Sequence, residues 1–389
     1  MKKNLLRKVA VSLAAMTLAF TFNMSAFAAD LTSGVSVTSD LSVNISKVLT
    51  ASNPDLSAVD GPGAAYSYAL SSVEPSSENG GTSVTDANNN TGTVHAGPEG
   101  GVTLGTNTVA FPVGTSVNTS AEGTANTKYF TAVSDLSRFS APGIYRYKIT
   151  ETPSPDDIGS TGVVDTGDRD RYLDVYIENG DNGLKVAGYT LHDRYNNKTD
   201  GFNGGSGGPG QPFTGAAEFE TKNIILTQEV AGNMGDKNNQ FPFDISVTDN
   251  GRSFYAAKEK LPVSQPSDQV TGSDSGSDIS TTLSHQEKYY ISGLSSVAYI
   301  NYTEKNNTPD AYVVSIEGGN PSDPSQISSG ATKIMGQTEV GQASLVKFTN
   351  KLDTVAPTGV AMRYGAYLFI IAAGILLVCF KNAGRRTER

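Results

Sequence analysis

Hydrophobic residues alternate with polar residues in short stretches through most of the chain, which predicts β-strands. Clusters of Gly, Asn, Asp, Ser and Pro separate these stretches and predict turns. Residues 177–183, Ile-Glu-Asn-Gly-Asp-Asn-Gly, are typical of a hairpin turn, because glycine readily adopts positive φ. The expected strands are Val43–Leu49, Tyr145–Glu151, Tyr172–Ile177, Leu184–Leu191, Phe219–Val230, Phe243–Val247, Tyr289–Ile291, Ala298–Glu304, Tyr312–Ile316 and Ser344–Asn350.

The strand pattern occurs twice, which predicts two domains of one type. In each half a strand ending in Thr-Glu, at Glu151 or Glu304, precedes a strand ending in Asn, at Asn223 or Asn350. We therefore expect an all-β fold of two tandem β-sandwich domains, residues 29–223 and 224–353. Two segments rich in small polar residues are expected to be loops, with no regular element in the second; they are Ser76–Gly105 and Gly201–Pro212.

Three polar residues fall on strand faces that are otherwise apolar. Alternate residues of a strand share a face, and an unpaired charge is costly to bury. These side chains must therefore contact one another or lie outside the core. They are Lys47 (with Val43, Ile45 and Leu49), Glu151 (with Tyr145, Tyr147 and Ile149) and Asn223 (with Phe219 and Ile225).

Both ends of the chain carry targeting signals. Residues 1–28 are expected to form a secretory signal peptide, with a basic start, a short apolar stretch and Ala26-Phe27-Ala28 before the expected cleavage site. Near the other end, Val355-Ala356-Pro357-Thr358-Gly359 precedes an apolar run and a basic tail. The run, Tyr364–Phe380, is about 25 Å long as a helix and predicts a transmembrane segment. This three-part arrangement of a pentapeptide, an apolar run and a basic tail resembles the cell-wall sorting signal of Gram-positive surface proteins. The resemblance implies that sortase cleaves after Thr358.

Composition excludes several functions. The formal net charge is −10, and the sequence has no stripe of basic residues. Both features argue against nucleic acid as a partner. The only cysteine, Cys379, lies in the apolar run, so disulfides cannot stabilise an exported form. Catalytic, metal-binding and cofactor-binding motifs are missing, so we expect no turnover enzyme, metal or cofactor. Four acidic residues between Asp165 and Asp174 lack the glycine of an EF-hand and are expected to form a solvated loop.

The chain between about Ser42 and Gly359 resembles the two-domain major pilins of the streptococcal T-antigen type. The resemblance rests on Lys47 in the early strand, the strand ending at Glu151, the Lys-Asn pair at Asn223, and the strands ending at Glu304 and Asn350. It implies a CnaB-like or immunoglobulin-like sandwich in each half. It also implies a self-formed isopeptide bond between Lys47 and Asn223, with release of ammonia.

Burial supplies a chemical reason for such a bond. An apolar site favours neutral forms, so we expect a lowered pKa for Lys47 and a raised pKa for Glu151. The neutral amine would attack the Asn223 side-chain amide while Glu151 shuttles protons. The reaction would occur once per molecule.

The second domain departs from this pattern, because Gln228 stands where the resemblance implies a lysine. A glutamine amide is not a nucleophile. We expect an uncrosslinked, hydrogen-bonded cluster of Gln228, Glu304 and Asn350 with Glu304 protonated. The nearest substitute lysines in the sequence are Lys222, Lys237 and Lys347.

The resemblance implies the backbone subunit of a covalent pilus, secreted, passing through a membrane-bound precursor and anchored to the cell wall. Its partners would be sortase, neighbouring pilin subunits, and peptidoglycan directly or through a basal pilin. Sortase would join Thr358 to a lysine of the next subunit, with Lys198, Lys185 and Lys222 as candidates. The alternative is a singly anchored adhesin or a minor pilin that binds a host or matrix ligand through its long loops.

Overall fold

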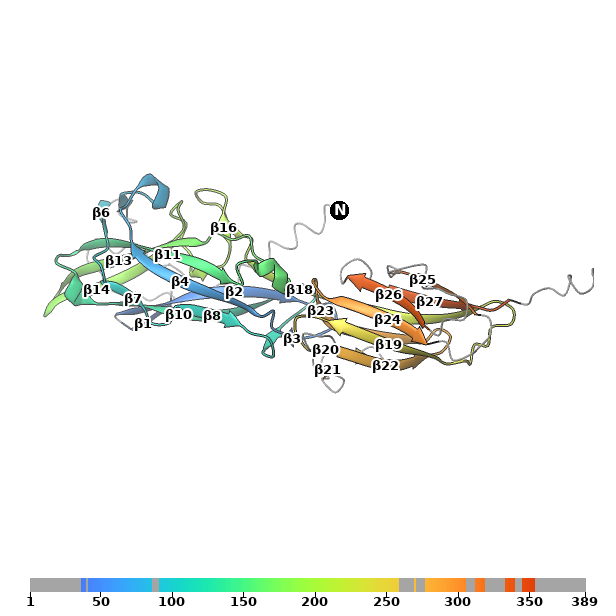
Figure 1. The fold of residues 1–389 in the computed structure, drawn as a ribbon. Helices are drawn as coiled ribbons and strands as arrows, with labels where there is room; N and C mark the ends of the chain where they lie inside the picture. Colours follow the sequence, from blue (N-terminus) through green and yellow to red (C-terminus); the bar gives the residue numbers. More distant parts are fainter. Residues whose placement is uncertain are drawn as a thin grey trace, which may run out of the picture.

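The computed structural model describes residues 36–39, 41–85, 91–258, 269–270, 277–305, 312–318, 333–339 and 345–353. Within these residues every regular element is a β-strand or a short 3-10 turn, as an all-β fold requires. The strands lie along an elongated body with two main hydrophobic cores (Figure 1). No helix in this part of the chain is long and apolar enough to cross a membrane. The expected signal peptide, sorting motif and transmembrane segment lie outside the described residues.

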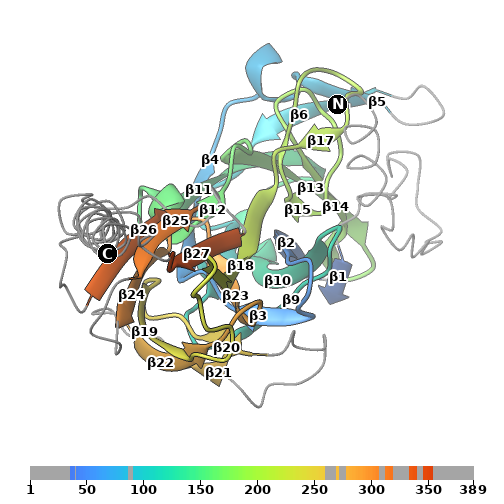
Figure 2. The same ribbon diagram turned by 90° about the vertical axis from the view of Figure 1, so that its right-hand side faces the viewer.

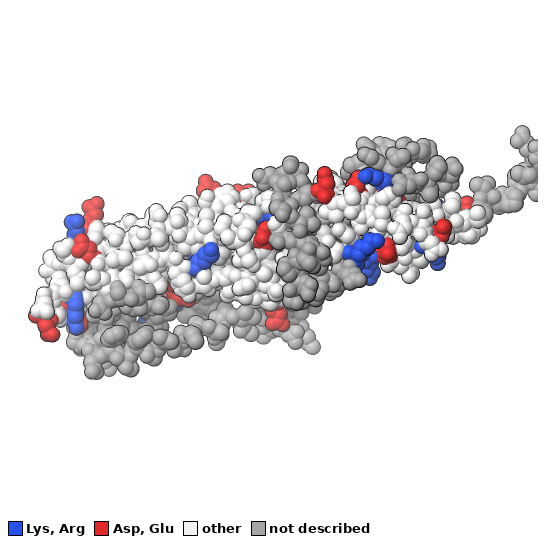
Figure 3. Space-filling model, turned by 90° about the horizontal axis from the view of Figure 1, so that it is seen from below, with Lys and Arg blue, Asp and Glu red and all other residues white. Residues whose placement is uncertain are grey.

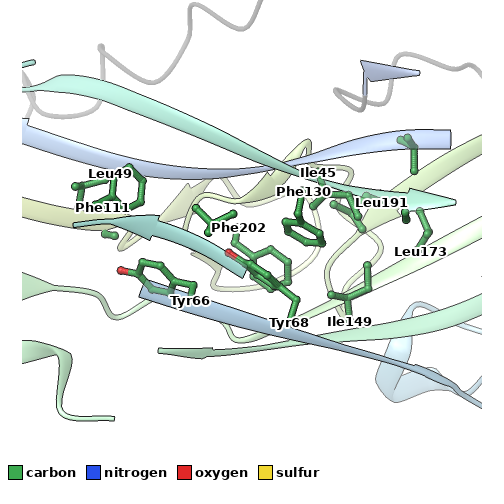
Figure 4. Packing of buried hydrophobic residues seen from close by; sticks show 14 of the residues in the cluster. Ile45, Leu49, Tyr66, Tyr68, Phe111, Phe130, Ile149, Leu173, Leu191 and Phe202 are labelled. Atoms are coloured by element: carbon green, nitrogen blue, oxygen red, sulfur yellow. The ribbon is translucent and has the colours of Figure 1, made fainter. Parts of the chain in front are cut away.

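The first core lies between two sheets of the N-terminal half. One sheet has the order β7-β10-β2-β18, and the other has the order β14-β13-β11-β4-β8. Figure 4 shows Ile45 and Phe130 of the first sheet facing Tyr68 and Ile149 of the second. The strands are β2 (Ser42–Ser52), β4 (Ala64–Ser72), β7 (Val102–Leu104), β8 (Thr108–Phe111), β10 (Thr124–Ser134), β11 (Gly143–Ser154), β13 (Asp170–Gly180), β14 (Gly183–His192) and β18 (Ala217–Ala231).

Shorter strands extend these two sheets. β1 (Ser36–Ser39) and β15 (Gly201–Phe202) pair with β2, and β12 (Val163–Val164) pairs with β18. β6 (Thr91–Ala96) pairs with β11 and with β5 (Ser83–Thr85). A separate small sheet joins β3 (Ala58–Asp60) to β9 (Ser116–Asn118).

The second core lies between two sheets of the C-terminal half. One contains β21-β20-β23-β18 together with β27 and β25, and the other has the order β22-β19-β24-β26. Its strands are β19 (Phe241–Thr248), β20 (Phe254–Ala257), β21 (Gln269–Val270), β22 (Ser277–Leu283), β23 (Lys288–Ser295), β24 (Tyr299–Lys305), β25 (Val313–Glu317), β26 (Lys333–Glu339) and β27 (Leu345–Lys351).

β18 belongs to both halves. Residues 217–220 pair with β2, whereas residues 221–231 pair with β23 and β27 (Figure 2). The buried side chains of β18 are odd-numbered in the first half, where Phe219 and Thr221 are buried. In the second half they are even-numbered, where Ile224 and Leu226 are buried. The two faces of one strand therefore cover two different cores. Asn223 lies at the changeover and is only half-buried, as is Ile225, so the expected continuation of the buried Phe219 face through Asn223 to Ile225 is wrong.

Each expected strand overlaps a strand of the structure, and the hairpin at residues 177–183 joins β13 to β14. The two expected loops need correction. Residues 76–105 contain β5, β6 and β7. Residues 201–212 contain β15 and β16 (Gly205–Ser206), the latter paired with β17 (Phe213–Thr214). Glycine is required at Gly201, because an added Cβ would lie 2.0 Å from the Ser46 carbonyl oxygen.

Candidate functional site

Lys47 lies on the inner face of β2 between Ile45 and Leu49, as the alternation predicts. Its side chain is only 2% exposed, and its Nζ atom lies 2.9 Å from Oε1 of Glu151. Glu151 projects from β11 of the opposite sheet. The structure therefore brings together two of the three residues that the sequence singled out in the first domain.

The third group at this site is Asp165, not Asn223. Lys47 Nζ lies 3.0 Å from Asp165 Oδ2, and the Asp165 side chain is 1% exposed. Asp165 directly follows β12, which pairs antiparallel with β18 through Val163 and Phe219. If the antiparallel pairing of β12 with β18 is extended by one residue past Val164, Asp165 lies opposite Ala217. Ala217 in turn pairs with Leu49 of β2.

Asn223 is displaced from this site by the strand register. Glu220 pairs with Ser52, so Asn223 lies beyond the end of β2. Lys47 is five residues before Ser52, which corresponds to roughly 16 Å of extended strand. Asn223 instead donates a 2.7 Å hydrogen bond to Asp55 and accepts one from Asn53.

The Arg169 guanidinium closes the site. Its Nη1 atom lies 2.6 Å from Glu151 Oε1 and 2.9 Å from Asp165 Oδ2. The Arg169 side chain is 30% exposed, so it separates the buried groups from solvent. Burial by itself would raise the pKa of Asp165, but Lys47 and Arg169 hold that pKa below its usual value.

Aromatic side chains surround the charged groups. Lys47 Nζ lies 3.9 Å from the centre of the Tyr66 ring, and the Tyr68 hydroxyl donates a 3.0 Å hydrogen bond to Glu151 Oε2. Tyr68 stacks on Phe130 at 3.9 Å, with Phe202 beside it (Figure 4). Burial and the nearby carboxylates raise the pKa of Tyr66 and of Tyr68 far above the usual range, so both phenols stay neutral.

The acidic stretch from Asp165 to Asp174 is not the solvated loop that the sequence predicted. Asp174 is buried and accepts two 2.7 Å hydrogen bonds from Arg146. His192 Nε2 lies 3.3 Å from the same carboxylate. Among the described residues, no group of His, Cys, Asp and Glu could hold a metal ion.

The second-domain cluster forms in part. Asn350 on β27 donates a short hydrogen bond to Glu304 on β24. Gln228 on β18 is fully buried, but its amide donates to the Glu229 carbonyl oxygen at 3.2 Å. Burial raises the pKa of Glu304 to about 7, opposed by the hydrogen bond from Asn350. Buried oxygens of all three side chains lack a partner among the described residues.

The three candidate acceptor lysines lie in different places. Lys185 is on β14 near the hairpin at the end of the body farthest from β27 (Figure 1), where it pairs with Glu178 at 2.9 Å. Lys198 is exposed between β14 and β15. Lys222 lies on β18 where the two halves meet. On the face in Figure 3, Lys and Arg are scattered among acidic side chains. Thr358 lies outside the described residues.

Comparison with known sequences gives two matches. A family model described as a domain of unknown function, DUF7601, matches residues 222–352. A protein named pilin from Streptococcus pyogenes serotype M1 is 26% identical over 272 residues, covering 67% of this chain and 72% of that protein.

Among solved structures, the major pilin of Streptococcus pyogenes aligns with 82% of this chain and 100% of its own, with 15% identity and a TM-score of 0.44. The T3.2 major pilin from the same species covers 80% of this chain and 98% of its own, with 15% identity and a TM-score of 0.43. The chain is thus similar in sequence to a streptococcal pilin over about two thirds of its length.

Proposed function

We propose that this chain is the backbone subunit of a sortase-assembled pilus on a Gram-positive cell, strengthened by an amide bond between Lys47 and Asp165. The observation that carries the proposal is the buried contact of an amine with a carboxyl group, 3.0 Å apart, beside a second carboxyl group on Glu151. The 26% identity to a streptococcal pilin supports the structural role.

The bond forms with balanced atoms and charge. The Lys47 ammonium and the Asp165 carboxylate become one amide and one water molecule. Glu151 takes a proton from the ammonium, the neutral amine adds to Asp165 Cγ, and Glu151 passes this proton and then a second proton from the nitrogen to the oxygen that leaves as water. The sequence implied ammonia as the leaving group, because it paired Lys47 with Asn223.

The product closes a loop between residues 118 positions apart. Like a disulfide, such a bond restricts the unfolded chain, which for a loop on the order of 100 residues stabilises the fold by about 4–5 kcal/mol. It would also tie β2 to the segment that follows β12 in an exported chain without disulfides. This suits a subunit under mechanical load.

Polymerisation uses the ends of the chain. The signal peptide directs export, sortase cleaves after Thr358 while the membrane-bound precursor is held by its sorting segment, and the acyl group passes to a lysine of the next subunit. Lys185 is the best placed acceptor, because its hairpin lies at the opposite end of the body from β27 (Figure 1). Each half is then a CnaB-like sandwich arranged along the fibre.

Intact mass spectrometry of recombinant residues 29–358, beside Lys47→Ala, tests the bond. We expect the parent to lack one water molecule and the variant to have its full mass. A parent at full mass would contradict the bond.

Wall extracts of the producing cell test the polymer. A ladder of high-mass species that survives boiling is expected, whereas a single wall-anchored band would indicate the alternative, a singly anchored adhesin or minor pilin.

A further inference from the structure

Arg169 contacts both carboxyl groups of the site, a role the sequence did not anticipate. Its Nη1 atom donates to Glu151 Oε1 at 2.6 Å and to Asp165 Oδ2 at 2.9 Å. Its Nη2 atom donates to the Asp165 backbone carbonyl at 3.1 Å. The Arg169 carbonyl oxygen in turn accepts a 2.7 Å hydrogen bond from the Glu151 N–H. Side chain and backbone therefore hold the loop of Asp165 against β11.

The charges at the site balance only when Arg169 is counted. Before the reaction, Lys47 and Arg169 face Glu151 and Asp165, which gives two positive and two negative groups within contact distance. Amide formation removes the charges of Lys47 and Asp165 together. Glu151, which is 1% exposed, would then be a buried carboxylate without a cation, and such a group is strongly unfavourable. Arg169 supplies that cation.

Negative charge also develops during the reaction at an atom that Arg169 contacts. When the amine adds to Asp165 Cγ, one carboxyl oxygen becomes an oxyanion. Asp165 Oδ2 accepts from Arg169, while Oδ1 accepts a 3.2 Å hydrogen bond from the Gly167 N–H. A preformed donor at the oxyanion lowers the barrier, and a guanidinium gives charged hydrogen bonds, which are the stronger kind.

We propose that Arg169 is a catalytic residue of the Lys47–Asp165 reaction, stabilising the oxyanion on Oδ2 and then neutralising Glu151 in the product. The inference rests on the proposed amide bond. Oδ2 becomes the amide carbonyl oxygen, and the other carboxyl oxygen leaves as water with the two protons that the ammonium loses. No further reactant is needed.

The test compares rates of bond formation in newly made protein. Residues 29–358 are synthesised in a cell-free system, quenched in denaturant at intervals, and weighed to find the fraction lacking one water molecule. Arg169→Gln is expected to slow bond formation roughly a hundredfold, as loss of one oxyanion donor does elsewhere. Arg169→Lys keeps the positive charge but cannot reproduce the simultaneous hydrogen bonds of Nη1 and Nη2 to Asp165. Its rate of bond formation is therefore expected to lie between those of Arg169→Gln and the parent.

Arg138→Gln is the matched control. Arg138 is 60% exposed and pairs with Asp135, far from the reacting groups, so this variant should react at the parental rate. Limited proteolysis of each sample reports whether the variant is folded while it reacts. If protease digests Arg169→Gln, that variant is not folded, and the role of Arg169 is tested with Arg169→Lys instead. A rate of bond formation in Arg169→Lys at least about tenfold below that of the parent supports the inference.

The experiment distinguishes a failure of the role proposed for Arg169 from a failure of the proposed amide bond. A folded Arg169→Gln variant that reacts at the parental rate overturns the role of Arg169 and leaves the amide bond intact. So does a parental rate in Arg169→Lys when Arg169→Gln cannot fold. A parent that never loses water overturns the proposed bond itself, and the role of Arg169 with it.

Discussion

The Nζ atom of Lys47 lies 3.0 Å from Oδ2 of Asp165, although 118 residues separate them in the chain. β18 brings them together, because it pairs with β2 on one side and with β12 on the other. The same strand continues into the second half and carries Gln228. The identity of the reacting groups therefore depends on the pairing of β18.

Replacing Asp165 by Asn should change the leaving group. The parent is expected to lose water, whereas Asp165→Asn should lose ammonia, because its side-chain amide then donates the acyl group. Intact mass spectrometry separates the two products. Asp168→Asn, in the same loop, is the control and should still lose water. Asn223→Ala should also keep the loss of water. A parent that loses ammonia instead, with no loss in Asn223→Ala, would make Asn223 rather than Asp165 the acceptor.

Replacing Gln228 by Lys should create a second bond. Gln228 is fully buried on β18, two residues before Val230, which pairs with Asn350. An amine at this position would meet the Asn350 amide beside Glu304. The variant is expected to lose one ammonia in addition to one water, and Gln228→Lys with Asn350→Ala should lose water alone. If Gln228→Lys loses only water, the second-domain site lacks the geometry for reaction.

The second domain should lose stability as the pH rises through neutrality. Burial raises the pKa of Glu304 to about 7 from 4.5, so the folded state binds this proton more tightly than the unfolded state. Its contribution is fully present below pH 4.5 and is lost as the pH rises through about 7. The full change is about 3 kcal/mol, at 1.36 kcal/mol per pKa unit.

Hydrogen exchange of β24 and β27, corrected for the intrinsic rate, measures this local stability at several pH values. Protection should fall between pH 5 and 8 in the parent and change much less in Glu304→Gln. Glu317→Gln, at a side chain 67% exposed, should behave as the parent does. Equal pH dependence in the parent and Glu304→Gln would assign the effect to another group.

Replacing Lys185 by Arg should abolish the high-mass ladder in wall extracts. Arginine keeps the charge and the contact with Glu178 but is a far weaker nucleophile, because its guanidinium stays protonated. Lys198→Arg and Lys222→Arg are the matched variants and should leave the ladder unchanged. A ladder that disappears only in one of these two would assign the acceptor to that lysine.

Local pattern alone determined ten of the strands and the burial of Lys47 and Glu151. Alternation has a period of two residues, so a short stretch of sequence shows which side chains share a face. It likewise indicated Gln228, Glu304 and Asn350, which lie buried on three strands of the second core. The joining of Glu304 to Asn350 followed the same reasoning.

Only the tertiary structure decided which group meets Lys47. Asp165 follows a strand of two residues, in a stretch that the sequence predicted to be a solvated acidic loop. Its burial depends on the register in which β12 pairs with β18. The alternation of hydrophobic and polar residues within one segment does not predict its register with a distant segment. Asn223 failed as a partner for the same reason, since β18 changes its buried face there and runs past the end of β2. The contacts of Arg169 follow from the position of Asp165, so they too were decided by the fold.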